Sequence, residues 1–348
     1  MKTSVAIVGC GHVASKKYFP ALHNLSKRVN VTGICDVSED LLHRAAKEWP
    51  KAGSYTDLGQ MVDEIHPDIV IICTPPLTHK AVAVEALSRG CHVLLEKPMA
   101  TTIEDCDAIV EAASMADRKV GLMHNQLYNM AVNKALRMTR NGDIGAFLGM
   151  QVLLVTPVDA MTADQDHWSH KLPGGVLGES GPHAVYLSLP WTGKVQEVSI
   201  VSRKILSEYP WSIAEDIRFQ LVGDQGISTV TMLFASKETA AELNIFGANG
   251  TLNADIQARS LAVQRRNSIR PIDVGASVSR AIGQRLWELG RVTGRYLTNR
   301  TIDAHQAGVE QFVDHVEFDS EFFSDADQGK EVVRVMQMLV RELDLHLG

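Results

Sequence analysis

The chain has 348 residues, 45% of them hydrophobic and 22% charged, a composition typical of a globular protein with about two domains. Its formal net charge of -7 argues against the broad cationic surface that backbone phosphates require, so we expect no nucleic-acid partner. No apolar run approaches the roughly 20 residues of a membrane-spanning helix, so we expect no membrane span.

The cysteines indicate a reducing compartment. They stand singly in the first third of the chain, at Cys10, Cys35, Cys73, Cys91 and Cys106. This pattern suits free thiols better than a disulfide framework or a zinc site. The chain also runs from Met1 almost directly into an apolar strand, which leaves no space for the apolar core and cleavage site of a signal peptide. We expect a soluble, cytoplasmic protein.

In the first third of the chain, strand-like and helix-like segments alternate. The strand-like runs are 5–9, 31–36, 68–76 and 91–98, and helical periodicity follows in 9–22, 40–49 and 79–90. Strands that alternate with helices of this length form a parallel sheet with right-handed crossovers. We therefore predict a doubly wound α/β domain over residues 1–123.

The pattern changes in the rest of the chain. Strand-like runs separated by Gly, Asn and Asp turns cover 150–156, 195–203, 216–234, 239–255 and 261–266. Consecutive hairpin-like strands imply a mostly antiparallel sheet, and helical spacing returns in 309–318 and 329–343. We predict a second, α+β domain over residues 124–348.

The first motif lies between the first strand and the first helix. Gly9-x-Gly11-x-x-Ala14 permits a tight turn and a close approach of backbone N–H groups to a pyrophosphate. Asp36 ends the next strand, where a carboxylate accepts hydrogen bonds from an adenosine ribose and repels a 2′-phosphate. The motif predicts a dinucleotide site that favours NAD over NADP.

The second motif is Glu96-Lys97-Pro98, at the end of a later strand of the same sheet. Ligands of open α/β sheets bind at this edge. A lysine beside a nicotinamide could hydrogen-bond a substrate oxygen and stabilise the alkoxide that forms as hydride leaves. In isolation, the alternative is a surface lysine before a turn proline.

The stretch "GGVLGESGPH" (174–183) places Glu179 four residues before His183. In a helix this spacing puts both side chains on one face, close enough to touch or to share a ligand. Taken alone, such a pair is more often structural than catalytic.

Together, several stretches resemble the family of glucose-fructose oxidoreductase, inositol dehydrogenase and rhizopine catabolism proteins (Gfo/Idh/MocA). They are "AIVGCGHVA", "TPPLTH", "AVAVEALSRGCHVLLEKPMA", "MHNQLYN" and "GGVLGESGPH", and they occur in the family's order. The resemblance implies an N-terminal Rossmann domain and a C-terminal domain with a large open-faced sheet that often mediates oligomerisation. It therefore implies a homo-oligomer, a dimer or a tetramer.

The resemblance also implies roles for particular residues. Lys97 would contact nicotinamide and substrate, His183 would accept a proton, and Glu179 would be its acidic partner. The family's usual residue at the acid position is aspartate, so Glu179 departs from it by one methylene, about 1.5 Å of carboxylate displacement. The expected cofactor contacts are Gly9, Gly11, His12, Val13, Asp36, Thr74, Pro75, His79, Glu96 and Lys97.

Three further residues are candidates for the substrate pocket: His124, Tyr128 and Trp168. Trp168 could pack on a sugar ring or belong to the core. No metal is expected, because His167-x-x-His170 lacks the spacing of zinc proteases and no ligand motif surrounds it.

A local exception to the acidity is the segment 264–300. It holds eight arginines against Asp273 and Glu288, a net charge of +6. Its apolar residues recur with helical spacing, and three glycines weaken the helix, so packing must hold it. Such a helix could lie against a partner subunit or an anionic surface, or could pack within its own protomer with a solvated arginine face.

These features predict an NAD-dependent dehydrogenase that acts on a secondary hydroxyl of a sugar, polyol or sugar derivative. Hydride would pass between the substrate carbon and the nicotinamide, with His183 exchanging the hydroxyl proton. The alternatives are a dinucleotide-binding regulator without turnover, and a glycosidase that uses bound NAD transiently. The sequence does not identify the sugar, the physiological direction or the number of subunits.

Overall fold

The computed structural model describes residues 2–265, 268–297 and 303–347. By their contacts, the described parts of 1–125 and 302–334 form one compact unit, and those of 126–301 and 335–348 form a second. Among these residues, no helix has the length and apolarity needed to cross a membrane.

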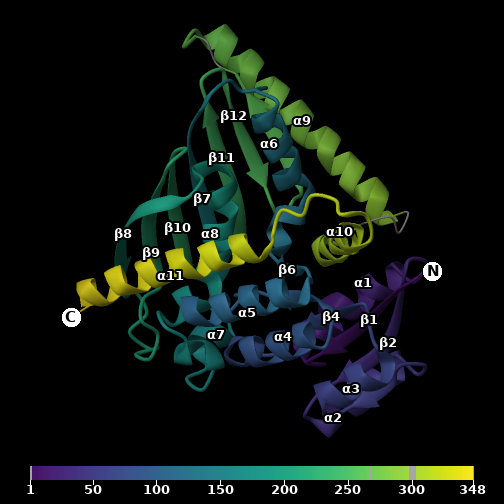
Figure 1. Ribbon diagram of the computed structural model, residues 1–348. Helices are drawn as coiled ribbons and strands as arrows, with labels where there is room; N and C mark the ends of the chain where they lie inside the picture. The colour runs from purple at the N-terminus through teal and green to yellow at the C-terminus, as the bar shows by residue number, and fades with distance from the viewer. Residues whose placement is uncertain (1, 266–267, 298–302, 348) are drawn as a thin grey trace. The chain divides into compact units, whose positions relative to one another are not determined.

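The first unit is built on a six-stranded sheet in the order β3-β2-β1-β4-β5-β6, with every neighbouring pair parallel (Figure 1). The strands are β1 (Thr3–Val8), β2 (Val29–Cys35), β3 (Gly53–Tyr55), β4 (Ile69–Ile72), β5 (His92–Glu96) and β6 (Val120–Met123). The strand order reverses between β1 and β4, and dinucleotides bind at this switch point in Rossmann folds. Buried β-branched residues such as Ile71 and Val93 form the centre of the sheet.

Helices of the first unit cover this sheet. In chain order they are α1 (Phe19–Asn24), α2 (Glu39–Glu48), α3 (Leu58–Ile65), α4 (His79–Ser88), α5 (Ile103–Ala116), α10 (Ala304–Phe318) and the start of α11 (Ala326–Leu347). Caps define their beginnings, because Ser38, Asp57 and Thr102 accept backbone N–H bonds ahead of α2, α3 and α5. The cysteines of this unit are free thiols.

The unit boundary differs from the expected one, because α10 packs with the first sheet rather than with the second. Phe312 is fully buried and lies so close to Gly121 of β6 that a Cβ at position 121 would stand 2.5 Å from its ring. The ring of Phe322 would lie 2.8 Å from the same Cβ. A strand glycine thus makes room for aromatic side chains from the far end of the sequence. The assignment of all of 124–348 to one domain remains a proposal.

The second unit holds a seven-stranded sheet in the order β13-β12-β11-β7-β10-β9-β8. Its strands are β7 (Phe147–Pro157), β8 (Val195–Arg203), β9 (Asp216–Gly223), β10 (Ile227–Ser236), β11 (Ala240–Gly247), β12 (Gly250–Asp255) and β13 (Ser260–Gln264). Only β7 and β10 pair in parallel. Alternate residues such as Val152 and Leu243 are buried, so one face of the sheet is covered. The predicted fold class is confirmed in both halves.

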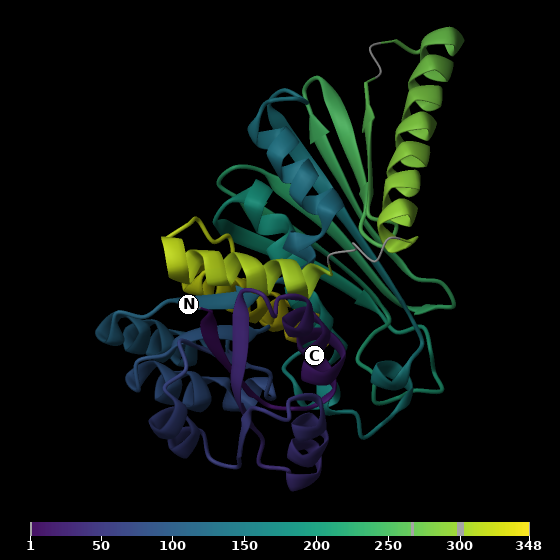
Figure 2. The ribbon, with the colours of Figure 1, turned by 90° about the vertical axis from the view of Figure 1, so that its right-hand side faces the viewer.

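The remaining helices belong to the second unit: α6 (Met130–Arg140), α7 (Ala160–Ala163), α8 (Val176–Thr192), α9 (Pro271–Leu297) and the end of α11. Helix α8 packs on β7, β9 and β10, whereas α9 runs along β13 at the edge of the sheet (Figure 2). Gln284 of α9 accepts the N–H of Val263 at 2.7 Å, which satisfies a backbone donor of that edge strand.

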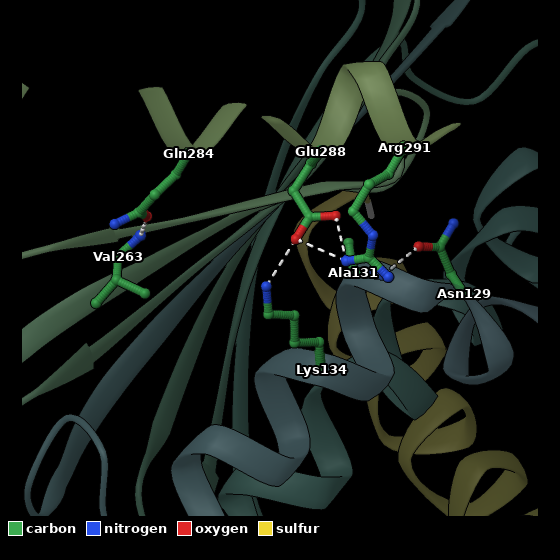
Figure 3. A network of polar contacts seen from close by, with 7 residues as sticks. All are labelled: Asn129, Ala131, Lys134, Val263, Gln284, Glu288 and Arg291. Carbon is green, nitrogen blue, oxygen red and sulfur yellow. Dashed lines mark hydrogen bonds and ion pairs between the residues drawn. The ribbon is translucent and has the colours of Figure 1, made fainter. Parts of the chain in front are cut away.

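Helix α9 therefore packs within its own unit, but not through the apolar residues of the sequence pattern. Its inner face carries Ser277, Ala281, Gln284 and Glu288, and Glu288 pairs with Lys134 of α6 at 2.7 Å (Figure 3). The outer face exposes Val278, Ile282 and Leu289. The side chain of Tyr296, which shares their pattern, lies outside the described residues.

Candidate functional site

The glycine loop follows β1 in the first unit. Gly9 has φ +88°, and a Cβ there would lie 2.7 Å from the backbone carbon of Cys73 in the loop after β4. A Cβ at Gly11 would meet nothing within 4 Å. Gly9 is thus required by the contact between the two loops, whereas Gly11 leaves open space where a phosphate can approach the backbone. His12 and Val13 follow, both exposed.

Asp36 stands at the end of β2, beside this loop. Its two carboxylate oxygens accept the N–H of Cys10 at 2.7 Å and the N–H of Ser38 at 2.8 Å. Each oxygen keeps a further lone pair for a hydroxyl group. The residue is 9% exposed, so a negative charge is fixed in place at the position that a ribose occupies in a Rossmann fold.

The loop after β4 carries Thr74 and Pro75, and it is held by His79. The imidazole is fully buried at the start of α4, with Nδ1 2.9 Å from the Pro98 carbonyl and Nε2 2.8 Å from the Thr74 carbonyl. Burial lowers the pKa of His79 against the opposing effect of these carbonyls. A neutral imidazole donates to only one of these carbonyls, but both ring nitrogens lie against the backbone, so this histidine joins two loops of the cofactor edge instead of presenting a nitrogen to a ligand.

Glu96, at the end of β5, belongs to a buried polar network that the sequence reading missed. Its Oε1 accepts a hydrogen bond from Tyr18 Oη at 2.8 Å and lies 3.6 Å from His305 Nε2. The other nitrogen of His305 lies 3.4 Å from Asp303, which caps α10. We call Tyr18, Glu96, Asp303 and His305 the Glu96 network. No local signal marks His305, because 209 positions of sequence separate it from Glu96.

In the Glu96 network, Glu96 and His305 each shift the pKa of the other toward the charged form. Burial acts to raise the pKa of Glu96, but His305 beside it and the hydrogen bond from Tyr18 lower it overall. Burial likewise acts to lower the pKa of His305, yet Asp303 and Glu96 outweigh it and raise that pKa. Each of these two groups thus favours the charged form of the other. Glu96 Oε2 in turn accepts the backbone N–H of Lys97 at 3.1 Å, so the network fixes the chain at the lysine.

His124 directly follows β6 in the first unit. It is 1% exposed, and burial lowers its pKa to about 3, with Glu96 opposing the shift. A neutral imidazole here can donate or accept a hydrogen bond, but it does not supply a cation at neutral pH.

Helix α8 of the second unit carries Glu179 and His183, on its first and second turns. His183 Nδ1 lies 2.6 Å from Tyr186 Oη, and that oxygen accepts the backbone N–H of Gln126 at 3.3 Å. Tyr186 is 1% exposed, so its position is fixed by packing. The sequence reading missed this tyrosine, although its spacing of three from His183 places it on the same helix face.

The other substrate candidates also lie in the second unit. Tyr128 is 6% exposed, and Trp168 is 45% exposed beside the ring of His167. That exposure excludes a core role for the tryptophan. His167 Nδ1 contacts Ser169 Oγ at 2.8 Å, and His170 Nε2 contacts the Asp164 carbonyl at 3.1 Å. Within the described ranges, no three His, Cys, Asp or Glu side chains are grouped to hold a metal ion.

The structure thus gathers the cofactor candidates at one edge of the first sheet. Gly9, Asp36, Thr74 and Glu96 follow or end β1, β2, β4 and β5, as the ligand edge of a parallel sheet requires. The open backbone at Gly11 and the fixed carboxylate of Asp36 fit a dinucleotide with a free ribose 2′-hydroxyl. The candidate acid and base share one helix of the second unit.

Comparison with known proteins agrees with this fold. Residues 3–124 match the family profile described as "Oxidoreductase family, NAD-binding Rossmann fold". The WlbA dehydrogenase from Bordetella pertussis, whose crystal structure contains NADH and UDP-GlcNAcA, superposes with a TM-score of 0.77. The superposition covers 99% of this chain and 97% of that one at 18% sequence identity. At this identity the likeness shows the fold.

Two of the relatives detected by sequence illustrate the range of similarity. An uncharacterized protein of Saccharomyces cerevisiae is 26% identical over 264 residues, which are 73% of this chain and 74% of that protein. A glycosyl hydrolase family 109 protein of Shewanella baltica is 30% identical over 180 residues, 46% of this chain but only 39% of the relative.

Fold, glycine loop and family profile together define an NAD-binding oxidoreductase. Residues 3–124 match the Rossmann domain of the Gfo/Idh/MocA family, which confirms the resemblance found in the sequence and NAD as the cofactor.

Proposed function

We propose that this protein is an NAD-dependent dehydrogenase that oxidises a secondary hydroxyl of a sugar, polyol or sugar derivative. The observation that carries the proposal is the His183–Tyr186 pair on α8. Tyr186 Oη already accepts the Gln126 N–H, and its second lone pair can accept a proton-bearing Nδ1 of His183. In that tautomer Nε2 keeps its lone pair, which is the state that a general base needs.

The remaining roles follow from the chain's own groups. His183 Nε2 takes the proton of the substrate hydroxyl, and Lys97 donates to the same oxygen as negative charge develops on it. Glu179 orients and polarises the imidazole, and the Glu96 network fixes the backbone at Lys97. The glycine loop and Asp36 would hold NAD, which would supply the hydride acceptor. The sugar class is supported by the nucleotide sugar bound to WlbA dehydrogenase.

The test is a screen of sugars, inositols and nucleotide sugars for NADH formation, followed by kinetics of site variants. Lys97→Ala and His183→Ala should each lower kcat by roughly two orders of magnitude while NAD binding persists. Glu179→Asp and Glu179→Gln should lower it about ten-fold, because a displaced or neutral side chain no longer orients the imidazole. Near-wild-type turnover in His183→Ala would remove that histidine from the mechanism.

A second candidate is a glycosidase in which hydride leaves the sugar and later returns to it. The similarity to the glycosyl hydrolase family 109 protein favours it. Release of free sugar from a glycoside, with NAD required but no net NADH formed, would identify this activity in the same screen. Lasting NADH accumulation with a free sugar as substrate would instead identify the dehydrogenase.

A further inference from the structure

A small cavity lies between β13 and α9 in the second unit. It is lined in part by the arginine-rich segment 264–300, to which the proposed function assigns no role. Its volume is about 180 Å³, and its lining residues are Val263, Arg265, Ser277, Arg280 and Gln284. Since a water molecule occupies about 30 Å³ in the liquid, the cavity has room for a tetrahedral anion.

The lining offers hydrogen-bond donors. Arg265 donates a hydrogen bond from one Nη to the Asp143 carbonyl, and Arg280 donates one from Nε to the Ala276 carbonyl. Further guanidinium N–H groups therefore remain on both arginines. Gln284 uses its amide oxygen on Val263, as Figure 3 shows, so its NH₂ group remains as a donor. None of the five lining residues is acidic.

Ser277 is the most informative of these residues. It is 2% exposed, and its hydroxyl has no hydrogen-bond partner among the residues that the structure describes. A buried hydroxyl without a partner costs about 1–3 kcal/mol, so native proteins usually satisfy such a group. Here the hydroxyl lines a cavity together with two arginines, and an oxyanion would satisfy all of these groups at once.

We propose that this cavity binds a phosphate-type oxyanion. Two guanidinium groups supply charge and paired donors, and the Ser277 hydroxyl and the Gln284 amide complete the set. The bound anion bridges α9 to the edge strand β13 and lowers the repulsion between Arg265 and Arg280. Either free phosphate or the phosphate group of a metabolite supplies this chemistry.

The test is titration calorimetry of the whole protein with inorganic phosphate, at ionic strength held constant with NaCl. Saturating NADH is present so that phosphate does not occupy the glycine loop. Arg280→Gln should weaken phosphate binding about ten-fold or more, since it removes a charge-assisted donor. Arg285→Gln is the matched control: it removes an exposed arginine of the same helix that does not line the cavity. The comparison holds whether or not the proposed dehydrogenase activity is found.

Ser277→Ala separates binding from folding. Alanine removes the unpartnered hydroxyl and favours the helix, so the anion-free protein should melt at the same temperature or higher, while phosphate affinity falls several-fold. A titration with glycerol phosphate distinguishes the sources: comparable affinity indicates a phosphorylated metabolite, and weaker binding indicates free phosphate. Equal loss of affinity in Arg280→Gln and Arg285→Gln, or no saturable binding by the wild type, would overturn the proposal.

Discussion

At the scale of single residues, the proposed role of His183 depends on Tyr186. Tyr186 Oη lies 2.6 Å from Nδ1, a contact that holds the plane of the ring. In the proposed mechanism this oxygen accepts the Nδ1 proton and leaves Nε2 as the base, so Tyr186 would be a positioning residue.

Tyr186→Phe tests this role. The variant keeps the packing of a ring that is 1% exposed but removes the oxygen. We expect kcat to fall about ten-fold with little change in KM, and the pH at which the rate is half-maximal to shift, because the base loses its Nδ1 partner. Steady-state kinetics across pH provide the measurement. An unchanged pH profile would assign the tyrosine a packing role alone.

Asp36 should set the choice between NAD and NADP. Its carboxylate is fixed by two backbone N–H groups, and in this position it would accept ribose hydroxyls and repel a 2′-phosphate, so NAD should bind more tightly. Calorimetric titration should show this preference in the wild type and a smaller one in Asp36→Ala. Asp40→Ala, which removes an exposed acid of α2, is the control. Tighter NADP binding by the wild type would contradict the ribose argument.

The Glu96 network should make stability depend on pH. The pKa of His305 in the folded protein is raised above its ordinary value of 6.5. Its contribution to the free energy of unfolding is therefore complete below pH 6.5 and is lost as the pH rises through the folded pKa. The folded pKa of Glu96 is lowered from 4.5, so its contribution is complete above that value and is lost as pH falls through the folded pKa. Both contributions are complete between pH 4.5 and pH 6.5, so the Glu96 network should stabilise the folded state most in that range.

His305→Gln should therefore lower the free energy of unfolding by roughly 3 kcal/mol near pH 6, where it removes the cationic partner of the buried Glu96. The loss should be smaller near pH 9, because the wild-type imidazole is then losing its charge. Urea unfolding at both pH values measures this loss of stability. The control is His43→Gln, which replaces an exposed histidine of α2. A loss that is equal at both pH values would exclude the charged pair as its cause.

At the scale of the element, periodicity identified the helix in the arginine-rich segment but not the face that packs. The sequence shows an apolar row through Val278, Ile282 and Leu289. The face that packs instead carries Gln284, which accepts a backbone N–H of the edge strand, and Glu288, which pairs with Lys134 of α6. An edge strand needs hydrogen-bond partners, and a periodicity argument counts only apolar residues. The long-range partner of each polar side chain was therefore not predictable.

The glycines of α9 give a prediction at this scale. A Cβ at Gly283 or Gly290 would meet nothing within 4 Å, so Gly→Ala there should raise the free energy of unfolding by about 0.5–1 kcal/mol, through backbone entropy alone. Gly181→Ala in α8 is the matched contrast, since its Cβ would lie 2.8 Å from the Met336 side chain. We expect that variant to be destabilised. Thermal unfolding compares the three, and a destabilised Gly290→Ala would show that the glycine serves a contact.

At the scale of the whole molecule, the sequence predicted what local patterns encode. Strand and helix alternation gave the first sheet, turn residues gave the second, and the glycine motif located the cofactor edge. It did not predict that α10 completes the first unit, because the contact of Phe312 with Gly121 joins positions 191 residues apart. A similar separation in sequence explains why local patterns did not predict the contact of His305 with Glu96. Both misses concern the same distant segment.

This segment should decide whether the first unit folds by itself. A fragment of residues 1–125 lacks Phe312, which is fully buried, and leaves Glu96 without the charge of His305. Losing such an aromatic contact costs about 3–5 kcal/mol, and losing the partner of a buried charge costs a similar amount. These losses approach the whole stability of a typical domain.

Residues 1–125 alone should therefore show no cooperative thermal transition by circular dichroism. The same fragment joined to residues 303–334 by a flexible linker of about 20 residues should recover one and should bind NAD. If the two fragments unfold at the same temperature, α10 is not needed to complete the first unit.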